Sequence, residues 1–478
     1  MRMRDLQGGG RVVAVAAAAL FALLLGVPRA VAEPDFTVPP TLKPQVDFWI
    51  SVFATYGKRQ IIIHDTDRLD RIYTVLDYSD LDREGLSETQ IELAMRDAEE
   101  GEKTRIRALL RHLDQVDPRS EYLTQEDERI LGLFAGDPSP TKLRDAAADD
   151  RVRGQRGLRE RFARGIQIAH AYFPTMEQIF RQEGVPAEIT RLPLVESCFN
   201  VHAYSKVGAA GVWQFMPGTG RRFLRIDGAV DERLDPIVAT RAAARFMREN
   251  YDQLGTWPLA IKAYNHGPGG IARAVRDTGT TDVATIIATY HGPAYKFASR
   301  NFYPEFLAAL HVERNYRKYF GDLPLDAPLT TDSIYLTQHT SMGAAARCAG
   351  ADPYELVALN PSLLPSVHSG RQPIPPGYEL RLPAGTGSRF RACAPSLLPP
   401  TRQLARRAPA PRGTASRSAE ARAGGKQQAD AVVHKVKPGQ TLAQIASLYG
   451  CSVDRIRRGN NLKGNKIHAG QMLRIPTS

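Results

Sequence analysis

The sequence predicts a multidomain α+β protein with a mainly helical body and two small modules that each contain two strands and two helices. The chain has 478 residues, which is more than one ordinary hydrophobic core accommodates. In much of the first two thirds, apolar residues recur at steps of three and four, as on the buried face of a helix. Two segments in the last third repeat each other, and repeats of that size form small modules.

Residues 1–32 have the layout of a secretory signal peptide. A basic start with three arginines precedes an apolar run over 12–27, and Ala30-Val31-Ala32 offers small side chains for cleavage. A membrane anchor is the alternative, but this run is short for a membrane span. We therefore expect an exported, periplasmic protein with no transmembrane anchor after cleavage, for which association with the cell wall or outer membrane stays open.

The formal net charge of +12 indicates an anionic partner. An anionic wall polymer, an anionic membrane surface and nucleic acid all satisfy this charge. Because exported proteins rarely meet nucleic acid, we expect no nucleic-acid partner.

The four cysteines are far apart and lack the CxxC spacing of a zinc site, so no metal is expected from them. Export permits disulfides. Cys348 and Cys393 flank one predicted module and are the expected pair if a disulfide forms, while free buried thiols are the alternative.

Residues 33–160 are predicted to be a mostly helical N-terminal region without an assigned function. Ile61-Ile62-Ile63 is typical of a short strand. Ser87 and Gln90 form a capping box, after which helical periodicity extends to Leu113. Residues 161–325 are predicted to form several helices separated by glycine-rich turns.

The internal repeat defines the two modules. Residues 341–361 align with 441–461 at an offset of 100 without a gap, and each copy ends in a similar short strand. The first copy is seven residues longer before that ending. We place the modules at 332–384 and 431–477.

A linker is predicted between the modules. Residues 385–430 are rich in Ala, Arg, Pro, Gly and Ser and bury too little apolar surface to fold. This basic segment either holds the protein near an anionic polymer or is merely a soluble tether.

Glu196 is the main candidate for chemistry. It follows an apolar helical stretch, and apolar surroundings raise a carboxyl pKa toward the range that a general acid needs. No acidic residue occurs from Ser197 to Ile226, so Glu196 has no carboxylate partner nearby in the sequence. A structural charge pair is the alternative role for such a glutamate.

Several separated motifs in 165–320 resemble the soluble lytic transglycosylase domain. They are Glu196-Ser197, the segment Gly208 to Met216, and Ala263-Tyr264-Asn265. The resemblance implies a lysozyme-like fold and cleavage of the β-1,4 bond between N-acetylmuramic acid and N-acetylglucosamine. Peptidoglycan glycan strands are then the expected partner, in cell-wall turnover.

The resemblance also assigns roles to individual positions. Glu196 matches the catalytic glutamate, and Tyr264 matches the tyrosine whose hydroxyl orients it. The matched substrate-binding positions are Ser197, Ser205, Gln214, Met216, Tyr264 and Asn265. Core packing is the alternative for Trp213 and Tyr264. Ala298 and Phe302 replace an acid and a tyrosine that the family often carries, which leaves contacts on that side open.

The two repeats resemble LysM modules, small βααβ units that bind glycans containing N-acetylglucosamine. The second copy carries Pro438, Gly439, Gln440 and Thr441 in the first sugar-facing loop. The first copy has the segment 338–341 there, without proline or glycine, and is expected to be a degenerate module that packs but binds weakly.

The chemistry expected for one carboxyl group is a transglycosylase reaction without metal or cofactor. Most glycosidases need two carboxyl groups. With Glu196 alone, the substrate's C6 hydroxyl closes on C1 and forms a 1,6-anhydromuramic end. The alternatives are a goose-type lysozyme-like hydrolase, which the acid-free run after Glu196 disfavours, a non-catalytic peptidoglycan-binding scaffold, and a chitin-cleaving enzyme.

Overall fold

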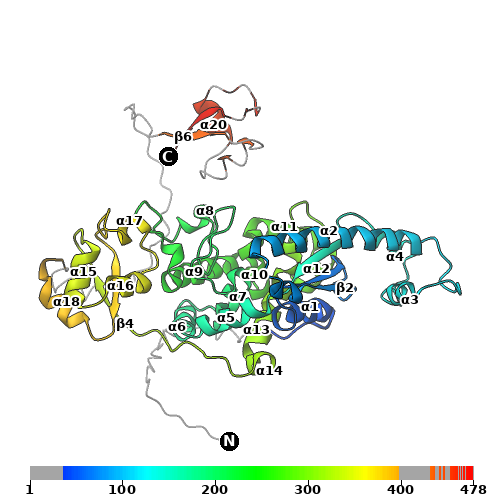
Figure 1. The fold of residues 1–478 in the computed structure, drawn as a ribbon. Coiled ribbons are helices and arrows are strands. Elements are labelled where there is room, and N and C mark those ends of the chain that lie inside the picture. The colour runs from blue at the N-terminus through cyan, green and yellow to red at the C-terminus, as the bar shows by residue number, and fades with distance from the viewer. Residues whose placement is uncertain are drawn as a thin grey trace, which may run out of the picture. The chain divides into compact units, whose positions relative to one another are not determined.

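The computed structural model describes residues 36–397 and, with gaps, residues 431–476 (Figure 1). The predicted signal peptide and most of the predicted linker lie outside the described residues. In the described residues, helices dominate and three small antiparallel sheets accompany them, so the α+β prediction is confirmed. None of the described helices has the length and apolar character needed to cross a membrane.

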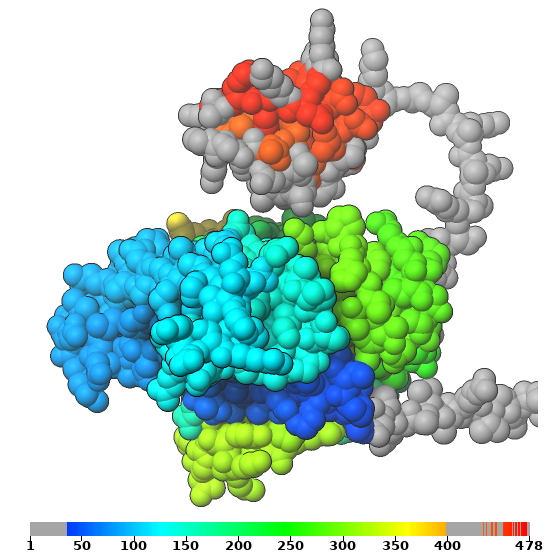
Figure 2. Space-filling model, turned by 90° about the vertical axis from the view of Figure 1, so that its right-hand side faces the viewer, coloured from blue at the N-terminus to red at the C-terminus, as the bar shows by residue number. Residues whose placement is uncertain are grey.

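The N-terminal helix α1 (Lys43–Ala54) is part of the main hydrophobic core of the body. It packs along α13 (Phe297–Arg314), and the Trp49 indole N–H donates to Asn301 Oδ1 at 3.2 Å. Figure 2 shows the blue N-terminal segment against yellow-green residues near the end of α13. The predicted boundary near residue 160 therefore does not separate two cores.

A three-stranded sheet joins this main core to a second one. Strand β1 (Gln60–Asp65) lies between β2 (Ile72–Asp77) and β3 (Val152–Arg156), both antiparallel to it. Ile62 faces the main core, while Ile61 and Ile63 face the second core, as the twofold alternation of a strand requires. The predicted strand is confirmed, and the two strands that flank it were not predicted.

Helix α2 (Glu88–Leu113) covers the second core. Gln90 N–H donates to Ser87 Oγ, and Ser87 N–H donates to Gln90 Oε1, so the predicted capping box is present. Two shorter helices, α3 (Gln125–Gly132) and α4 (Lys142–Ala146), complete this core.

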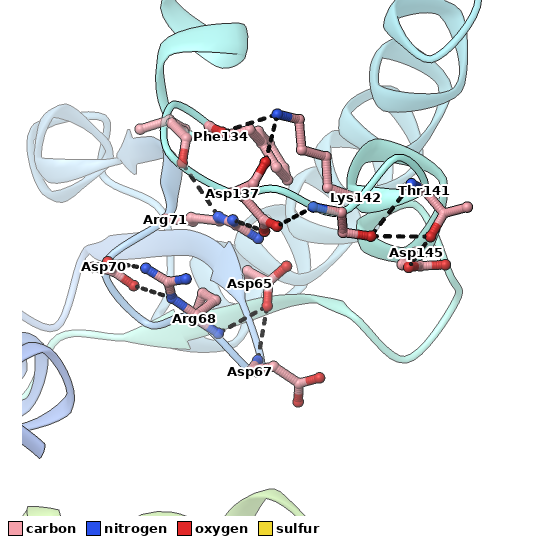
Figure 3. Close-up of polar contacts among 12 residues, drawn as sticks. Asp65, Asp67, Arg68, Asp70, Arg71, Phe134, Asp137, Thr141, Lys142 and Asp145 are labelled. Atoms are coloured by element: carbon pink, nitrogen blue, oxygen red, sulfur yellow. Dashed lines mark hydrogen bonds and ion pairs between the residues drawn. The ribbon is translucent and has the colours of Figure 1, made fainter. Parts of the chain in front are cut away.

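The turn between β1 and β2 is tied to the loop after α3. Figure 3 shows Arg71 reaching Asp137 across the two segments. The Arg71 guanidinium also lies 4.2 Å from the centre of the Phe134 ring. Asp65 accepts hydrogen bonds from the backbone N–H groups of Asp67 and Arg68 at 2.8 and 3.0 Å, which fixes the turn itself.

The helices of residues 159–320 pack around the main core. Their bounds are α5 Arg159–Ala169, α6 Phe173–Gln182, α7 Leu192–Ser197, α8 Pro217–Gly220, α9 Pro236–Leu254, α10 Trp257–His266, α11 Pro268–Thr278, α12 Val283–Thr289 and α14 Tyr316–Phe320. Helix α9 begins at Asp235, whose Oδ1 accepts from two backbone N–H groups at 3.0 Å. It ends at Gly255, where φ is +79°.

The first repeat copy has the predicted order of strand, helix, helix and strand. The elements are β4 (Thr331–Tyr335), α15 (Met342–Ala349), α16 (Pro353–Leu359) and β5 (Glu379–Pro383). The longer segment of this copy contains one further short helix, α17 (Pro365–His368).

The predicted start of the linker was wrong. Helix α18 (Gly387–Cys393) continues the first module, because Phe390 is fully buried in the module's core. Cys393 forms a disulfide with Cys348, which confirms the expected pair. The fold extends to Leu397, whose backbone carbonyl accepts from Thr337 N–H at 2.8 Å.

The first module is docked on the helical body. Val230 of the body pairs with Leu363 in a short β-bridge and is buried in the module's core. Asp231 N–H donates to Ser362 O at 2.8 Å. The Arg381 guanidinium forms an ion pair with the carboxylate of Asp235; the Asp235 side chain is buried and the Arg381 side chain is largely covered.

The terminal copy has the same two-stranded plan. Strands β6 (Ala431–Lys435) and β7 (Met472–Pro476) are antiparallel, and α20 (Val453–Gly459) lies between them in sequence. The buried residues Ile456, Leu473 and Ile475 contribute to its small core.

Candidate active site

Helix α7 holds Glu196 at its C-terminal end. The helix stops there because Cys198 and Phe199 adopt backbone φ values of +50° and +54°, which residues other than glycine rarely adopt. Helix α5 runs very close to this turn, since a Cβ atom on Gly165 would lie 2.5 Å from the Cys198 carbonyl oxygen. Strained backbone of this kind is common where a side chain must be held in one position.

The Glu196 carboxyl group is half-buried and forms no hydrogen bond within the described residues. Burial raises its pKa to about 8, and the carboxyl of Glu305 is the second cause. The direction of this shift is the one predicted from the apolar sequence around Glu196.

Ser197 and Ser205 support the loops beside Glu196. Ser197 Oγ lies 3.2 Å from Pro193 O and 3.1 Å from Val212 O, which links α7 to the segment after it. Ser205 Oγ accepts from Ala209 N–H at 2.9 Å and closes a tight loop. Both hydroxyl groups therefore have partners in the protein.

The segment 211–216 forms a wall near α7. Gln214 has φ of +49°, and its amide donates to Gly211 O at 2.8 Å. Gly211 must be glycine because a Cβ atom there would lie 1.7 Å from Arg233 O. Met216 is 39% exposed and is available to a ligand.

Trp213 is a core residue, in agreement with the alternative considered for it. Its side chain is fully buried, its N–H donates to Thr240 Oγ1 at 2.9 Å, and it stacks on Phe180.

Tyr264 is on α10 and lies beside Glu196, which is on α7. Its hydroxyl donates to Trp213 O at 2.8 Å, which leaves the oxygen lone pairs free to accept a proton donor. Burial raises the Tyr264 pKa well above its ordinary value, and the Glu196 charge adds to this effect. Asn265 is exposed at the end of the same helix, and its Oδ1 lies 3.4 Å from Ser299 Oγ.

Glu305 and Lys262 are candidate site residues that the sequence analysis missed. Glu305 comes from α13 and is half-buried, and burial raises its pKa to about 8. Lys262 on α10 is 1% exposed, and burial lowers its pKa to about 7. Position 305 lies seven residues after Ala298, about two helical turns, so both occupy nearly the same face of α13.

Comparing the residues on one face of the predicted helix at 302–319 with Ala298 would have identified Glu305 as a candidate. No acid follows Glu196 closely in the sequence, whereas the fold brings one from the distant helix α13. Since Ala298 was known to replace an acid, an acid two turns further along the same face was the available signal.

The predicted glycan loops are described only in part. Pro438, Gly439 and Gln440 lie outside the described residues, and Thr441 is exposed. In the first copy, Thr340 pairs with Ile374 in a β-bridge and Ser341 caps α15, so both have structural roles. In the described part of the chain, no three His, Cys, Asp or Glu side chains are grouped to hold a metal ion.

A helical domain that holds a half-buried acid of raised pKa beside a tyrosine hydroxyl is typical of enzymes that use general acid catalysis. Comparison with known proteins gives the particular class. Residues 175–287 match the transglycosylase SLT domain, and residues 434–476 match the LysM domain. The chain therefore contains an SLT domain and a LysM domain and is a lytic transglycosylase.

The relatives include membrane-bound lytic murein transglycosylase D of Escherichia coli strain K12. It is 26% identical over 359 residues, which cover 72% of each chain. The 70 kDa soluble lytic transglycosylase SLT70 of Escherichia coli aligns with a TM-score of 0.26 and 24% identity, over 32% of this chain and 25% of that one. The lytic transglycosylase Slt of Pseudomonas aeruginosa aligns with a TM-score of 0.28 and 21% identity, over 42% of this chain and 30% of that one.

Proposed function

We propose that this protein cleaves the β-1,4 bond between N-acetylmuramic acid and N-acetylglucosamine in peptidoglycan and leaves 1,6-anhydromuramic ends. The observation that carries the proposal is the Glu196 carboxyl group, which is half-buried without a hydrogen-bond partner in the described residues and has a raised pKa. Such a group keeps its proton at neutral pH and can release it to a substrate.

In the first step, protonated Glu196 donates its proton to the glycosidic oxygen. The bond between C1 and that oxygen breaks, and its electron pair stays on the oxygen. The acetamido oxygen of the muramic residue stabilises the positive charge at C1, so the substrate supplies what a second carboxylate supplies in most glycosidases. Tyr264, which lies beside Glu196, is proposed to orient the carboxyl group.

In the second step, the Glu196 carboxylate accepts the proton of the C6 hydroxyl as that oxygen bonds to C1. No water is consumed, and Glu196 regains its proton for the next cycle. We assign substrate contacts to Ser197, Ser205, Gln214, Met216 and Asn265. Ser197 follows Glu196 on α7, and its hydroxyl bonds to Val212 in the 198–216 segment, which holds the next three residues. Asn265 follows Tyr264 on α10.

Export to the periplasm and wall turnover belong to the same proposal. The basic N-terminal segment followed by an apolar run supports export, and the LysM match supports glycan binding. A glycan-bound LysM domain raises the local concentration of substrate at the catalytic domain.

Hydrolysis is the second candidate, and Glu305 is the observation that favours it. With two carboxyl groups, one protonates the leaving oxygen while the other activates water. Helix α13, which carries Glu305, packs against α7, which carries Glu196, and the charge of Glu305 adds to the raised pKa of Glu196.

Mass spectrometry of muropeptides tests both candidates. Purified peptidoglycan is digested with the mature chain and, as a control, with Glu196→Gln, which keeps the side-chain size but cannot donate a carboxyl proton. Products one water lighter than hydrolytic products, and absent with the control, are expected. Reducing-end products would establish the hydrolase instead, and no products from either protein would favour a binding scaffold.

A further inference from the structure

A cavity of about 460 Å³ lies between the SLT domain and the first module. Sites that hold small ligands are concave and of this size. One wall is the loop at 201–204, which closely follows Glu196, and the other is formed by α16 and α17. Backbone hydrogen bonds fix the two walls relative to each other, since Leu364 N–H donates to Ala229 O at 2.9 Å. The cavity is therefore a built feature of this junction.

Two tyrosine rings are exposed on the walls of the cavity. Tyr204 is 56% exposed, and its hydroxyl donates to Asp231 Oδ2 at 3.1 Å, which holds the ring in place while its face stays open. Tyr354, in the first turn of α16, is 84% exposed. A ring left this open buries little surface on folding, so packing does not explain it.

The corresponding helix of the terminal copy presents a different face. On α16, the cavity is lined by Tyr354, Val357 and Ala358. The aligned positions of the terminal copy are all charged and are Asp454, Arg457 and Arg458. Helix α17 lies in the segment that is longer in the first copy. The first copy thus has an aromatic and apolar wall where its repeat carries charges.

The lining offers hydrogen-bonding groups without formal charge. None of the described residues that line the cavity is Asp, Glu, Lys or Arg. His368 Nε2 is buried and has no hydrogen-bond partner, and the Tyr172 hydroxyl forms no hydrogen bond within residues 36–397. Buried polar atoms normally have a partner, and these two groups suit the hydroxyl and amide groups of an uncharged ligand.

We propose that this cavity is a further glycan subsite, in which the Tyr204 and Tyr354 rings stack on uncharged N-acetylhexosamine units of the strand that Glu196 cleaves. The C–H groups on one face of a sugar ring are attracted to the negative face of an aromatic ring. The loop after Glu196 carries both the assigned contact Ser205 and this wall, so a strand bound at Glu196 can continue into the cavity. The inference rests on the proposed function, in which the glycan strand is the substrate.

This subsite differs from the sugar-facing loop expected in the first copy. That loop, residues 338–341, contributes nothing to the described lining. Sugar binding by the first copy would therefore depend on its junction with the SLT domain and not on the module alone.

Hydrogen exchange of residues 353–368 tests the proposal in the full chain. The probe is the β-1,4-linked hexamer of N-acetylglucosamine, and Glu196→Gln is the background because it binds glycan without cleaving it. We expect the hexamer to slow exchange in this segment. Adding Tyr354→Ala should raise the hexamer concentration needed for half of this effect by roughly three- to tenfold, because one ring contact is lost.

Two further variants sharpen the test. Ala358→Arg places the residue of the terminal copy in the cavity and should abolish the slowing, and the exposure of Ala358 makes this change compatible with folding. Tyr122→Ala is the matched control, because Tyr122 is 92% exposed and does not line the cavity. Its hexamer dependence should equal that of the background.

The proposal is overturned if the hexamer leaves exchange at 353–368 unchanged, or if Tyr354→Ala responds as Tyr122→Ala does. Slowing that follows protein concentration without hexamer would assign this face to a second copy of the chain and would also overturn it. Exchange is measured in a chain that cannot cleave, so this result is separate from the muropeptide test. Cleavage without protection at 353–368 would reject the subsite alone.

Discussion

The two repeat copies share one anchoring residue. In the first copy, Asn360 donates to Leu356 O and Arg381 O at 2.8 Å and accepts from Arg381 N–H at 2.9 Å. In the terminal copy, Asn460 makes the same three bonds, to Ile456 O, Arg474 O and Arg474 N–H. One asparagine therefore pins the second helix to the last strand in each copy.

The copies differ in what surrounds this shared plan. The arginine of the last strand is Arg381 in the first copy, where it forms a buried ion pair with the helical body, and Arg474 in the terminal copy, where it is exposed. Twenty-one positions separate Asn360 from Arg381, against 14 for Asn460 and Arg474, and the longer segment carries the contacts to the body. The same repeat is thus built into the body in the first copy, while the terminal copy keeps the sequence of the predicted glycan loop.

The disulfide is expected to give the largest difference between the copies. It closes a loop of 45 residues in the first copy, while Leu448 stands at the position in the terminal copy that corresponds to Cys348. Cys348→Ser should destabilise the first copy by about 4 kcal/mol through the entropy of the unfolded loop. Hydrogen exchange of the β4 and β5 amides measures this locally, which a multidomain chain requires.

Reductant supplies the control for this prediction. Exchange in the unaltered chain should rise toward that of Cys348→Ser when reductant is added, and the variant should not respond. Equal exchange in both proteins without reductant would show that the disulfide adds no stability to the first copy.

The buried ion pair is expected to give the next largest difference. Arg381→Ala leaves the Asp235 carboxylate buried without its guanidinium, which should cost about 3 kcal/mol, reduced because two N–H groups of α9 still bind it. Arg474→Ala removes an exposed side chain and should change stability by less than about 0.5 kcal/mol. Exchange of the β5 and β7 amides gives both values, and similar values would break the comparison.

The shared asparagine should give a smaller difference. Asn360→Ala removes the three shared hydrogen bonds and a fourth from the Tyr378 hydroxyl at a fully buried site, and should cost about 3 kcal/mol at most. Asn460→Ala removes the shared bonds at a half-exposed site, where water can replace them, and should cost about 1 kcal/mol. If both variants cost the same, burial is not what distinguishes the copies.

Activity should show the smallest effect. Deleting residues 431–478 should lower the rate on intact sacculi by roughly tenfold, because the local substrate concentration falls. The rate on soluble glycan fragments should stay unchanged. Rates on both substrates, compared with those of Arg381→Ala, show whether glycan retention belongs to the terminal copy alone.

Local signals were the ones that sequence reasoning interpreted correctly. The strand at Ile61–Ile63, the capping box at Ser87 and the order of elements in the repeats depend on residues close together in the chain. Strand β3 was missed because its sequence, Val-Arg-Gly-Gln-Arg, is polar, and its pairing with β1 is set by the fold. Helix α18 was missed because its composition resembles that of the linker, although Phe390 and Cys393 bind it to the module.

In the candidate site, too, sequence reasoning identified what local sequence indicates and missed what depends on the packing of distant helices. The sequence placed Glu196 in apolar surroundings, and the family resemblance assigned Tyr264 to orient it. Burial raises the pKa of both groups, while their catalytic roles stay predictions. Glu305 and Lys262 escaped because their importance arises only when α10 and α13 pack against α7. The absence of an acid in a stretch of sequence is therefore weak evidence about a folded cleft.

Asp235 both caps α9 and pairs with Arg381, and this has a consequence for biosynthesis. A chain is made from its N-terminus, so Asp235 emerges 146 residues before Arg381. During that interval the backbone N–H groups at the start of α9 are already present to hold the carboxylate. The helix start thus acts as a temporary partner, and the body can fold before the module that completes this site has been synthesised.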